Sequence, residues 1–245
     1  MSLRAAVLFL SLCFAGLLIS PGSLGAADIE RCLTAKEPVL VIQNCSEVDF
    51  QKLPKKDQAV ILNRIGISYR KLEKFEEAIE VYQIASQVDP SFVNTYNNLA
   101  NVYTILGQYE ISIELLTIAI SLDAHDPLHF INRAGVYSDM DDHRMALEDI
   151  KKAMLIDDAN PRVFDARATI YYRMEEYKQA VRDYSQAIRL DPQFHEAYFG
   201  RANTYAKMKH FERAVEDYNK SLSIDPDFIP ARKNRDWVCS KYTSC

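Results

Sequence analysis

The sequence repeats itself with a period of 34 residues over most of its length. Aspartate returns at this spacing as Asp89, Asp123, Asp157, Asp191 and Asp225, and tyrosine as Tyr69, Tyr103, Tyr137, Tyr171 and Tyr205. Three further columns hold only small residues: Gly66, Ala100, Ala134, Ala168 and Ala202; Ala78, Ser112, Ala146, Ala180 and Ala214; and Ala85, Ala119, Ala153, Ala187 and Ser221. Such a period indicates one supersecondary unit copied along the chain, with each copy burying its apolar faces against its neighbours.

Each copy has the pattern of two helices joined by a short turn. In the last copy, residues 198–208 and residues 211–224 both place apolar or small side chains at helical spacing. The dipeptide Asp225-Pro226 then ends the second helix, because proline disfavours helical geometry in the residue before it. The small columns allow the two helices to approach closely, and the tyrosine column fills the space beside them.

These columns, together with a ring column, resemble the tetratricopeptide repeat; the ring column is Phe75, Tyr109, His143, Tyr177 and Phe211. The resemblance implies an all-α fold, a right-handed superhelix (α-solenoid) of antiparallel helix pairs. It places five repeats at 59–92, 93–126, 127–160, 161–194 and 195–228. Two repeats depart from the family pattern, with Ala124 and Asp158 at the terminal proline position. Pro127 and Pro161 follow, and we expect each in the first turn of the next helix, where proline costs little.

The two ends of the chain differ from the repeats. Residues 1–27 resemble a secretory signal, with Arg4 before an apolar run over residues 5–19 and small residues that favour cleavage before Asp28. We therefore expect a secreted or periplasmic protein with no membrane span after cleavage. The alternative is an uncleaved membrane anchor, although the run is shorter than the roughly 20 residues that span a bilayer. Residues 28–58 are expected to form an N-terminal cap, and residues 229–245 a C-terminal capping helix and tail.

Four cysteines remain after signal cleavage: Cys32, Cys45, Cys239 and Cys245. An even number of cysteines in an exported protein predicts disulfide bonds. Three connectivities are open, and local closure, which pairs Cys32 with Cys45 and Cys239 with Cys245, is preferred because each bond then closes one end of the chain. A zinc site is the less favoured alternative.

Two columns change from apolar to charged at the third repeat. The first is Ile65 and Leu99, followed by Arg133, Arg167 and Arg201. The second is Val81 and Leu115, followed by Asp149, Asp183 and Asp217. Because the two columns change together, we interpret them as structural ion pairs between the helices of each repeat, in bidentate geometry. Anion-binding or catalytic arginines are the alternative.

Sequence signatures of enzymes and cofactor proteins are missing. The glycines beyond the signal are scattered and form no phosphate-binding loop, and neither GxSxG nor HExxH occurs. We therefore expect no enzyme, no cofactor and no metal, with His125 and His129 as the alternative metal pair. The net charge of −5 argues against a general affinity for nucleic acid.

Polar and aromatic residues gather at the positions that, by the resemblance, line the concave groove. We expect the groove to be lined by Asn94, Asn97, Asn98, Asn101, Asn132, Arg162, Asp165, Thr169, Tyr172, Arg173, Phe199, Asn203 and Asn234. Asparagine is a poor residue for a helix interior, but it offers two donors and an acceptor without charge, which suits the backbone of an extended peptide. The alternative is a merely solvated polar face, on which Asn98→Ala and Asn101→Ala would be tolerated.

The sequence therefore predicts a scaffold or assembly factor that binds protein or extended peptide in its groove, in an extracytoplasmic compartment. One alternative is a structural subunit that docks into an envelope or secretion complex through its convex face or its ends. Exposed apolar residues on the second helices would favour this alternative. An enzyme or cofactor protein is the least favoured. The sequence carries no signal for the oligomeric state.

Overall fold

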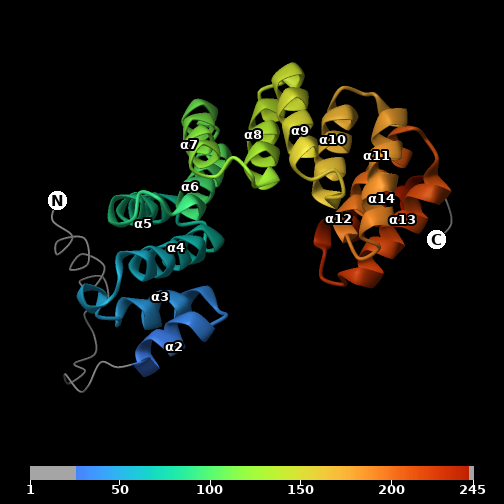
Figure 1. Cartoon of the computed structure of the whole chain (residues 1–245). Helices are drawn as coiled ribbons and strands as arrows, with labels where there is room; N and C mark the ends of the chain where they lie inside the picture. Colours follow the sequence, from blue (N-terminus) through green and yellow to red (C-terminus); the bar gives the residue numbers. More distant parts are fainter. Residues whose placement is uncertain (1–25, 243–245) are drawn as a thin grey trace. The chain divides into compact units, whose positions relative to one another are not determined.

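The computed structural model describes residues 26–242, and helices are the only regular elements in that range (Figure 1). The chain divides into two compact units, unit 1 ending at Asp123 and unit 2 beginning at Ala124. Residues 1–25 of the predicted signal peptide, and Cys245, lie outside the described range. Within it, none of the helices is long and apolar enough to cross a membrane.

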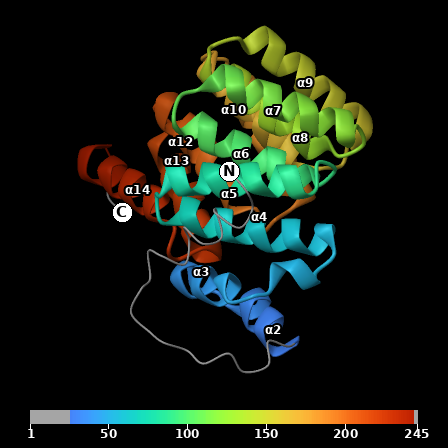
Figure 2. The same ribbon diagram turned by 90° about the vertical axis from the view of Figure 1, so that its left-hand side faces the viewer.

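Unit 1 is a run of helices that pack in chain order (Figure 2). Its elements are α2 (Ala26–Thr34), α3 (Pro38–Ser46), the 3₁₀ turn η1 (Phe50–Lys52), α4 (Lys55–Lys71), α5 (Phe75–Val88), α6 (Val93–Ile105) and α7 (Tyr109–Leu122). The contacts between α4 and α5 and between α6 and α7 are the most extensive in this unit, as expected for helix pairs.

Unit 2 follows the same plan with three helix pairs and a last helix. Its elements are α8 (Pro127–Asp139), α9 (His143–Ile156), α10 (Pro161–Arg173), α11 (Tyr177–Leu190), α12 (His195–Lys207), α13 (Phe211–Ile224) and α14 (Ile229–Tyr242). The first helices of successive pairs also touch, because α10 contacts both α8 and α12, and α12 contacts α14. The predicted fold class, an all-α solenoid of adjacent helix pairs, is confirmed.

The two displaced prolines begin helices, as expected. Pro127 opens α8 behind the N-cap Asp126, whose Oδ1 accepts from the Leu128 amide at 2.8 Å. Pro161 opens α10 behind Asn160, whose Oδ1 accepts from the Arg162 amide at 3.0 Å. Proline costs little here because the first amides of a helix have no intrahelical acceptor.

The repeated columns serve packing and turn formation. The small column from Ala78 to Ala214 is fully buried in every copy, which brings the two helices of each pair together. The aspartate column closes the second helices with side-chain turns. In these turns, Asp89, Asp157, Asp191 and Asp225 each accept from the amide two residues later, at 2.9 to 3.2 Å.

One residue in the turn inside each helix pair has a left-handed backbone. These residues are Glu73, Gly107, Asp141, Glu175 and Lys209, with φ between 59° and 72°. They fall 34 residues apart, so the turn geometry repeats with the sequence. Only one copy uses glycine, the residue with no steric cost in this conformation.

The disulfide between Cys32 and Cys45 joins α2 to α3 in the N-terminal cap. Both half-cystines are fully buried, in the core that continues into α4 and α5. Arg64 of α4 donates through Nε to the Cys32 carbonyl at 3.0 Å and through Nη2 to the Ala35 carbonyl, and these bonds fix the cap on the first repeat. The pairing of Cys239 with Cys245 stays a prediction, because Cys245 is outside the described residues.

Gly200 of α12 allows a tyrosine from the preceding pair to pack against the helix backbone. A Cβ at this position would lie 2.5 Å from Cε1 of the buried Tyr184. We expect Gly200→Ala to destabilise the protein by about 1–3 kcal/mol, because the ring must move within a packed core. Gly135→Ala is the matched control, since a Cβ on that helical glycine meets nothing within 4 Å. The control should stabilise the protein by up to about 1 kcal/mol. Chemical denaturation of both variants tests this, and equal shifts would contradict it.

Candidate functional site

The predicted groove residues fall into two sets, one in each unit. Asn94, Asn97, Asn98 and Asn101 lie on α6 in unit 1. The remaining residues lie on α8, α10, α12 and α14 in unit 2. Every one of them is on the first helix of a pair or on the last helix.

The asparagines of α6 differ in their surroundings. Asn98 is partly buried and donates from Nδ2 to Oδ1 of the buried Asn63 on α4, at 3.0 Å. Asn97 donates to the Val93 carbonyl of its own helix at 3.3 Å. Asn94 and Asn101 are exposed. The bond from Asn98 therefore joins two first helices, and Asn98→Ala would leave a buried amide oxygen without its donor, a loss of about 1–3 kcal/mol.

In unit 2, buried tyrosines of the second helices reach through to the first helices. The Tyr184 hydroxyl of α11 lies 3.0 Å from the Thr169 hydroxyl of α10. The Tyr218 hydroxyl of α13 donates to Oδ1 of Asn203 on α12 at 2.6 Å, and Asn234 of α14 donates to the same oxygen at 2.9 Å. Burial raises the pKa of both tyrosines, so their hydroxyls stay protonated.

These bonds form two groups, one between α10 and α11 and one among α12, α13 and α14, which we together call the polar row: Thr169, Tyr184, Asn203, Tyr218 and Asn234. Thr169, Asn203 and Asn234 belong to the predicted groove set. The two tyrosines were missed, although Tyr82, Tyr184 and Tyr218 occupy one position of the repeat. That recurrence was the signal that could have found them.

Aromatic side chains accompany the polar row. The Phe199 ring lies 6.1 Å from the Tyr218 ring and 5.1 Å from the Phe228 ring, measured between centroids. The Tyr172 ring lies 5.9 Å from the Tyr177 ring. These contacts hold Phe199 and Tyr172 in place beside the polar groups.

The two arginines of the predicted set have different environments. Arg173 donates to the Ser138 carbonyl at 3.2 Å and to Asp139 Oδ1 at 2.6 Å, so it ties α10 to α8. Arg162 is exposed at the start of α10. It borders an open hollow of about 290 Å³, which is also lined by Asp126, Leu128, Ile131, Asn160 and Pro161. Asn132 is partly buried on α8.

Asp165 of α10 has a partly buried carboxyl group. It is partly accessible to solvent, yet its pKa is raised to about 7, mainly by burial and in part by the charge of Glu196 on α12. No hydrogen bond or ion pair of its side chain is found within residues 26–242. Near neutral pH this carboxyl therefore exists in both protonated and ionised forms.

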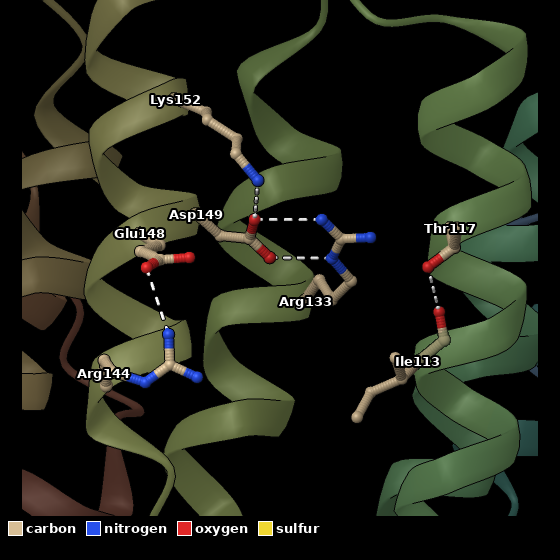
Figure 3. Close-up of polar contacts among 7 residues, drawn as sticks. All are labelled: Ile113, Thr117, Arg133, Arg144, Glu148, Asp149 and Lys152. Atoms are coloured by element: carbon tan, nitrogen blue, oxygen red, sulfur yellow. Dashed lines mark hydrogen bonds and ion pairs between the residues drawn. The ribbon is translucent and has the colours of Figure 1, made fainter.

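The structure also brings together each predicted arginine–aspartate pair. Arg133 donates from Nε to Asp149 Oδ2 at 2.7 Å and from Nη2 to Oδ1 at 2.9 Å, and Lys152 adds a third bond at 3.1 Å (Figure 3). Arg167 contacts Asp183, and Arg201 contacts Asp217, with the same two-bond geometry. The aspartate raises the pKa of Arg133 and Arg167 through this bond, so the guanidinium groups remain charged.

Two of these arginines also contact the preceding helix pair. Arg167 Nη1 lies 3.1 Å from the Met154 sulfur, and Arg201 Nη1 donates to the Ser185 hydroxyl at 2.9 Å. Each of these two guanidinium groups contacts its own helix pair and the preceding helix pair, and it therefore connects neighbouring repeats of unit 2.

Comparisons with known proteins agree with this architecture. A model described as TPR repeat matches residues 66–104 and 168–209, and models of the tetratricopeptide repeat match residues 195–228 and 93–117. No curated protein matches the sequence at a significant level.

Several solved structures share the fold at low sequence identity. A thermophilic TPR protein of Thermus thermophilus has a TM-score of 0.68 at 17% identity, over 74% of this chain and 99% of that one. The Cut9–Hcn1 hetero-tetramer of the APC/C has a TM-score of 0.65 at 16% identity, over 97% of this chain and 53% of that one. PilF of Pseudomonas aeruginosa has a TM-score of 0.59 at 18% identity, over 76% of this chain and 89% of that one. With its columns, its helix pairs and these matches, the chain is a tetratricopeptide repeat protein.

Proposed function

We propose that this chain is a scaffold that holds an extended segment of a partner protein along α10, α12 and α14 of unit 2. The observation that carries the proposal is the fixed amide of Asn203. Its Oδ1 accepts two hydrogen bonds, from Tyr218 and from Asn234. Because the oxygen is held in this way, the Nδ2 group must point in the other direction, and its two donors have no partner within the described residues.

An uncharged, oriented donor of this kind suits the carbonyl groups of a peptide backbone. Thr169 on α10 is held similarly, by the Tyr184 hydroxyl, so the groups are ordered before any partner binds. Preordered groups lose little side-chain entropy on binding, which favours affinity. The aromatic rings of Tyr172 and Phe199 beside them offer apolar contacts to the side chains of the bound segment.

The setting that we propose is extracytoplasmic. The signal-like sequence of residues 1–27 supports it, because a segment of this kind directs export. The buried Cys32–Cys45 disulfide supports it independently, because disulfides persist in oxidising compartments and are rare in the cytosol.

Substituting Asn203 by aspartate is the sharpest test of the scaffold proposal. Asn203→Asp keeps the acceptor oxygen for Tyr218 and Asn234 but replaces the Nδ2 donors by a second acceptor. A backbone carbonyl then faces an oxygen, and we expect partner capture to fall at least tenfold, equivalent to about 1.4 kcal/mol. Capture is measured by affinity purification from extracts of the source cells with quantitative mass spectrometry of the co-purifying protein.

Asn219→Asp is the matched control, because Asn219 is exposed on the second helix α13 and its Oδ1 accepts from Arg235 at 3.2 Å. The substitution makes the same change of charge and keeps that acceptor. We expect capture by the control to equal that of the parent. If both variants capture the partner as the parent does, binding along α12 is ruled out.

Exposed apolar side chains on second helices favour a second candidate function, docking through the convex face. Leu155 of α9 is 80% exposed, and α7 exposes Ile111, Ile118 and Leu122. The same capture experiment decides between the two functions. Loss of capture by Leu155→Ser, with normal capture by Asn203→Asp, would support the structural subunit.

A further inference from the structure

The exposed face of the second helices changes charge along the chain. Four positions of each repeat, the 18th, 22nd, 25th and 29th, lie on the second helix and are exposed in every copy apart from the partly buried Ser185. We call these the outward positions. On α5 and α7 they hold four glutamates and no lysine or arginine, whereas on α9 and α11 they hold five cations and one glutamate.

The acidic surface consists of the glutamates at the outward positions of α5 and α7: Glu76, Glu80, Glu110 and Glu114. No lysine or arginine occurs in the sequence between Lys74 and Arg133, so this part of unit 1 has no strong cation of its own. Lys74 lies 3.8 Å from Glu77, which is outside the set. The four glutamates have no ion-pair partner among the described residues.

The basic surface consists of the cations at the outward positions of α9 and α11: Arg144, Lys151, Lys178, Arg182 and Arg189. Glu148 neutralises only Arg144, at 3.1 Å (Figure 3). The other acids of these two helices, Asp149 and Asp183, are buried and bound by arginines of the first helices. Within residues 26–242, Lys151, Lys178 and Arg182 have no hydrogen-bond or ion-pair partner, so this surface keeps its positive charge.

The two surfaces match in spacing as well as in charge. Each lies on the second helices of two consecutive repeats, and the charges occupy the same positions of the repeat. Glu110 and Glu114 on one side, and Lys178 and Arg182 on the other, stand four residues apart, which is about one helical turn. Complementary charges of this kind steer two proteins together and determine the register in which they bind.

Each surface also exposes an apolar side chain among its charges. Ile111, next to Glu110, is 40% exposed, and Leu155, one turn after Lys151, is 80% exposed. Removing such side chains from water favours association. A contact between the two surfaces would therefore combine opposite charges with apolar burial.

We propose that the basic surface of one copy of this chain binds the acidic surface of a second copy. A second copy presents acids at the spacing of the cations, together with apolar side chains. The net charge of −5 opposes binding of the whole chain to a polyanion, which is the other class of acidic partner. The proposal goes beyond the scaffold function and does not depend on it, because the outward positions lie on second helices and the scaffold function uses first helices.

Reversing the charges of each surface separately tests the proposal. The acid-reversed variant is Glu110→Lys with Glu114→Lys, and the base-reversed variant is Lys178→Glu with Arg182→Glu. The parent and the variants are purified from cells that express the full chain. Their association is measured by sedimentation velocity over a series of protein concentrations, in roughly 0.05 M and about 1 M salt.

We expect the parent to associate at low salt and to dissociate at high salt, where the Debye length falls to about 3 Å. Each reversed variant alone should associate at least tenfold more weakly than the parent. An equimolar mixture of the two should form a complex, because the basic surface of the first and the acidic surface of the second are intact. All four substitutions in one chain exchange the two signs and should restore association.

The matched control is Glu212→Lys with Glu216→Lys. It makes the acid reversal at the same repeat positions of α13, outside both surfaces, and should associate as the parent does. A control as weak as the reversed variants, or a mixture that associates no better than its components, overturns the proposal. So does a parent that stays monomeric at low salt. If that monomer binds vesicles of phosphatidylglycerol and base reversal abolishes the binding, the basic surface belongs to an anionic membrane instead.

Discussion

Removing Arg167 or Asp183 alone is expected to lower the free energy of unfolding by about 3 kcal/mol, because the first change leaves the buried Asp183 charged without its partner and the second leaves the partly buried Arg167 so. The Asp183 side chain is only 12% exposed, and both of its oxygens are bound by Arg167 at 2.7 and 2.8 Å. Replacing both residues by leucine should recover most of the loss. The second repeat already uses this apolar combination, as Leu99 and Leu115.

A double-mutant cycle in chemical denaturation measures the coupling between Arg167 and Asp183. The pair Arg144 and Glu148 serves as the control, because its side chains are 72% and 54% exposed although they lie 3.1 Å apart. An exposed pair one helical turn apart contributes only about 0.3–0.5 kcal/mol. A coupling for Arg167 and Asp183 as small as that of the control would show that the paired columns do not determine stability.

Replacing Asp165 by asparagine should stabilise the protein above neutral pH, by an amount that approaches at most about 4 kcal/mol. The folded protein raises the pKa of this acid from 3.8 to about 7, so it binds the proton more tightly than the unfolded chain does. The contribution of Asp165 to stability is therefore greatest below pH 4 and is lost progressively as the pH rises to about 7. Asparagine has nearly the same shape and does not ionise.

The measurement is the difference in free energy of unfolding between the parent and Asp165→Asn, taken from pH 4 to pH 8. We expect the difference to be small at pH 4 and to grow in favour of the variant as the pH rises. Asp158→Asn, which changes an exposed acid, should give a difference that stays flat. A flat curve for Asp165→Asn as well would mean that its carboxyl is not desolvated in the folded protein.

The parts of the fold that the sequence predicted are those that repeat. Periodic columns indicate the helix pairs, and two columns that change together indicate that Arg167 and Asp183 are in contact. The positions of Pro127 and Pro161 could be predicted because local chemistry alone places proline in a first helical turn. In each case the information lies within one repeat or in the comparison of equivalent positions.

The hydrogen bonds between repeats could not be predicted in this way. Asn98 has a side chain of the type that often binds ligands, yet its amide donates to Asn63 of the preceding first helix. Which amide reaches which acceptor depends on the distance and rotation between neighbouring first helices, and periodicity does not specify these. The sequence also could not predict that Asp165 is unpaired, because this depends on which acids bind Arg167 and Arg173.

The charged columns give the two units different responses to temperature. Unit 2 holds all three arginine–aspartate pairs, whereas the equivalent positions of unit 1 are Ile65 with Val81 and Leu99 with Leu115. The hydration of charged groups becomes less favourable on heating, which reduces the penalty for burying an ion pair. Apolar burial, by contrast, weakens on cooling. Heating should therefore destabilise the repeats with ion pairs less than the apolar repeats. Cooling should destabilise unit 1 first. One chain is thus expected to contain both a heat-tolerant and a cold-sensitive half.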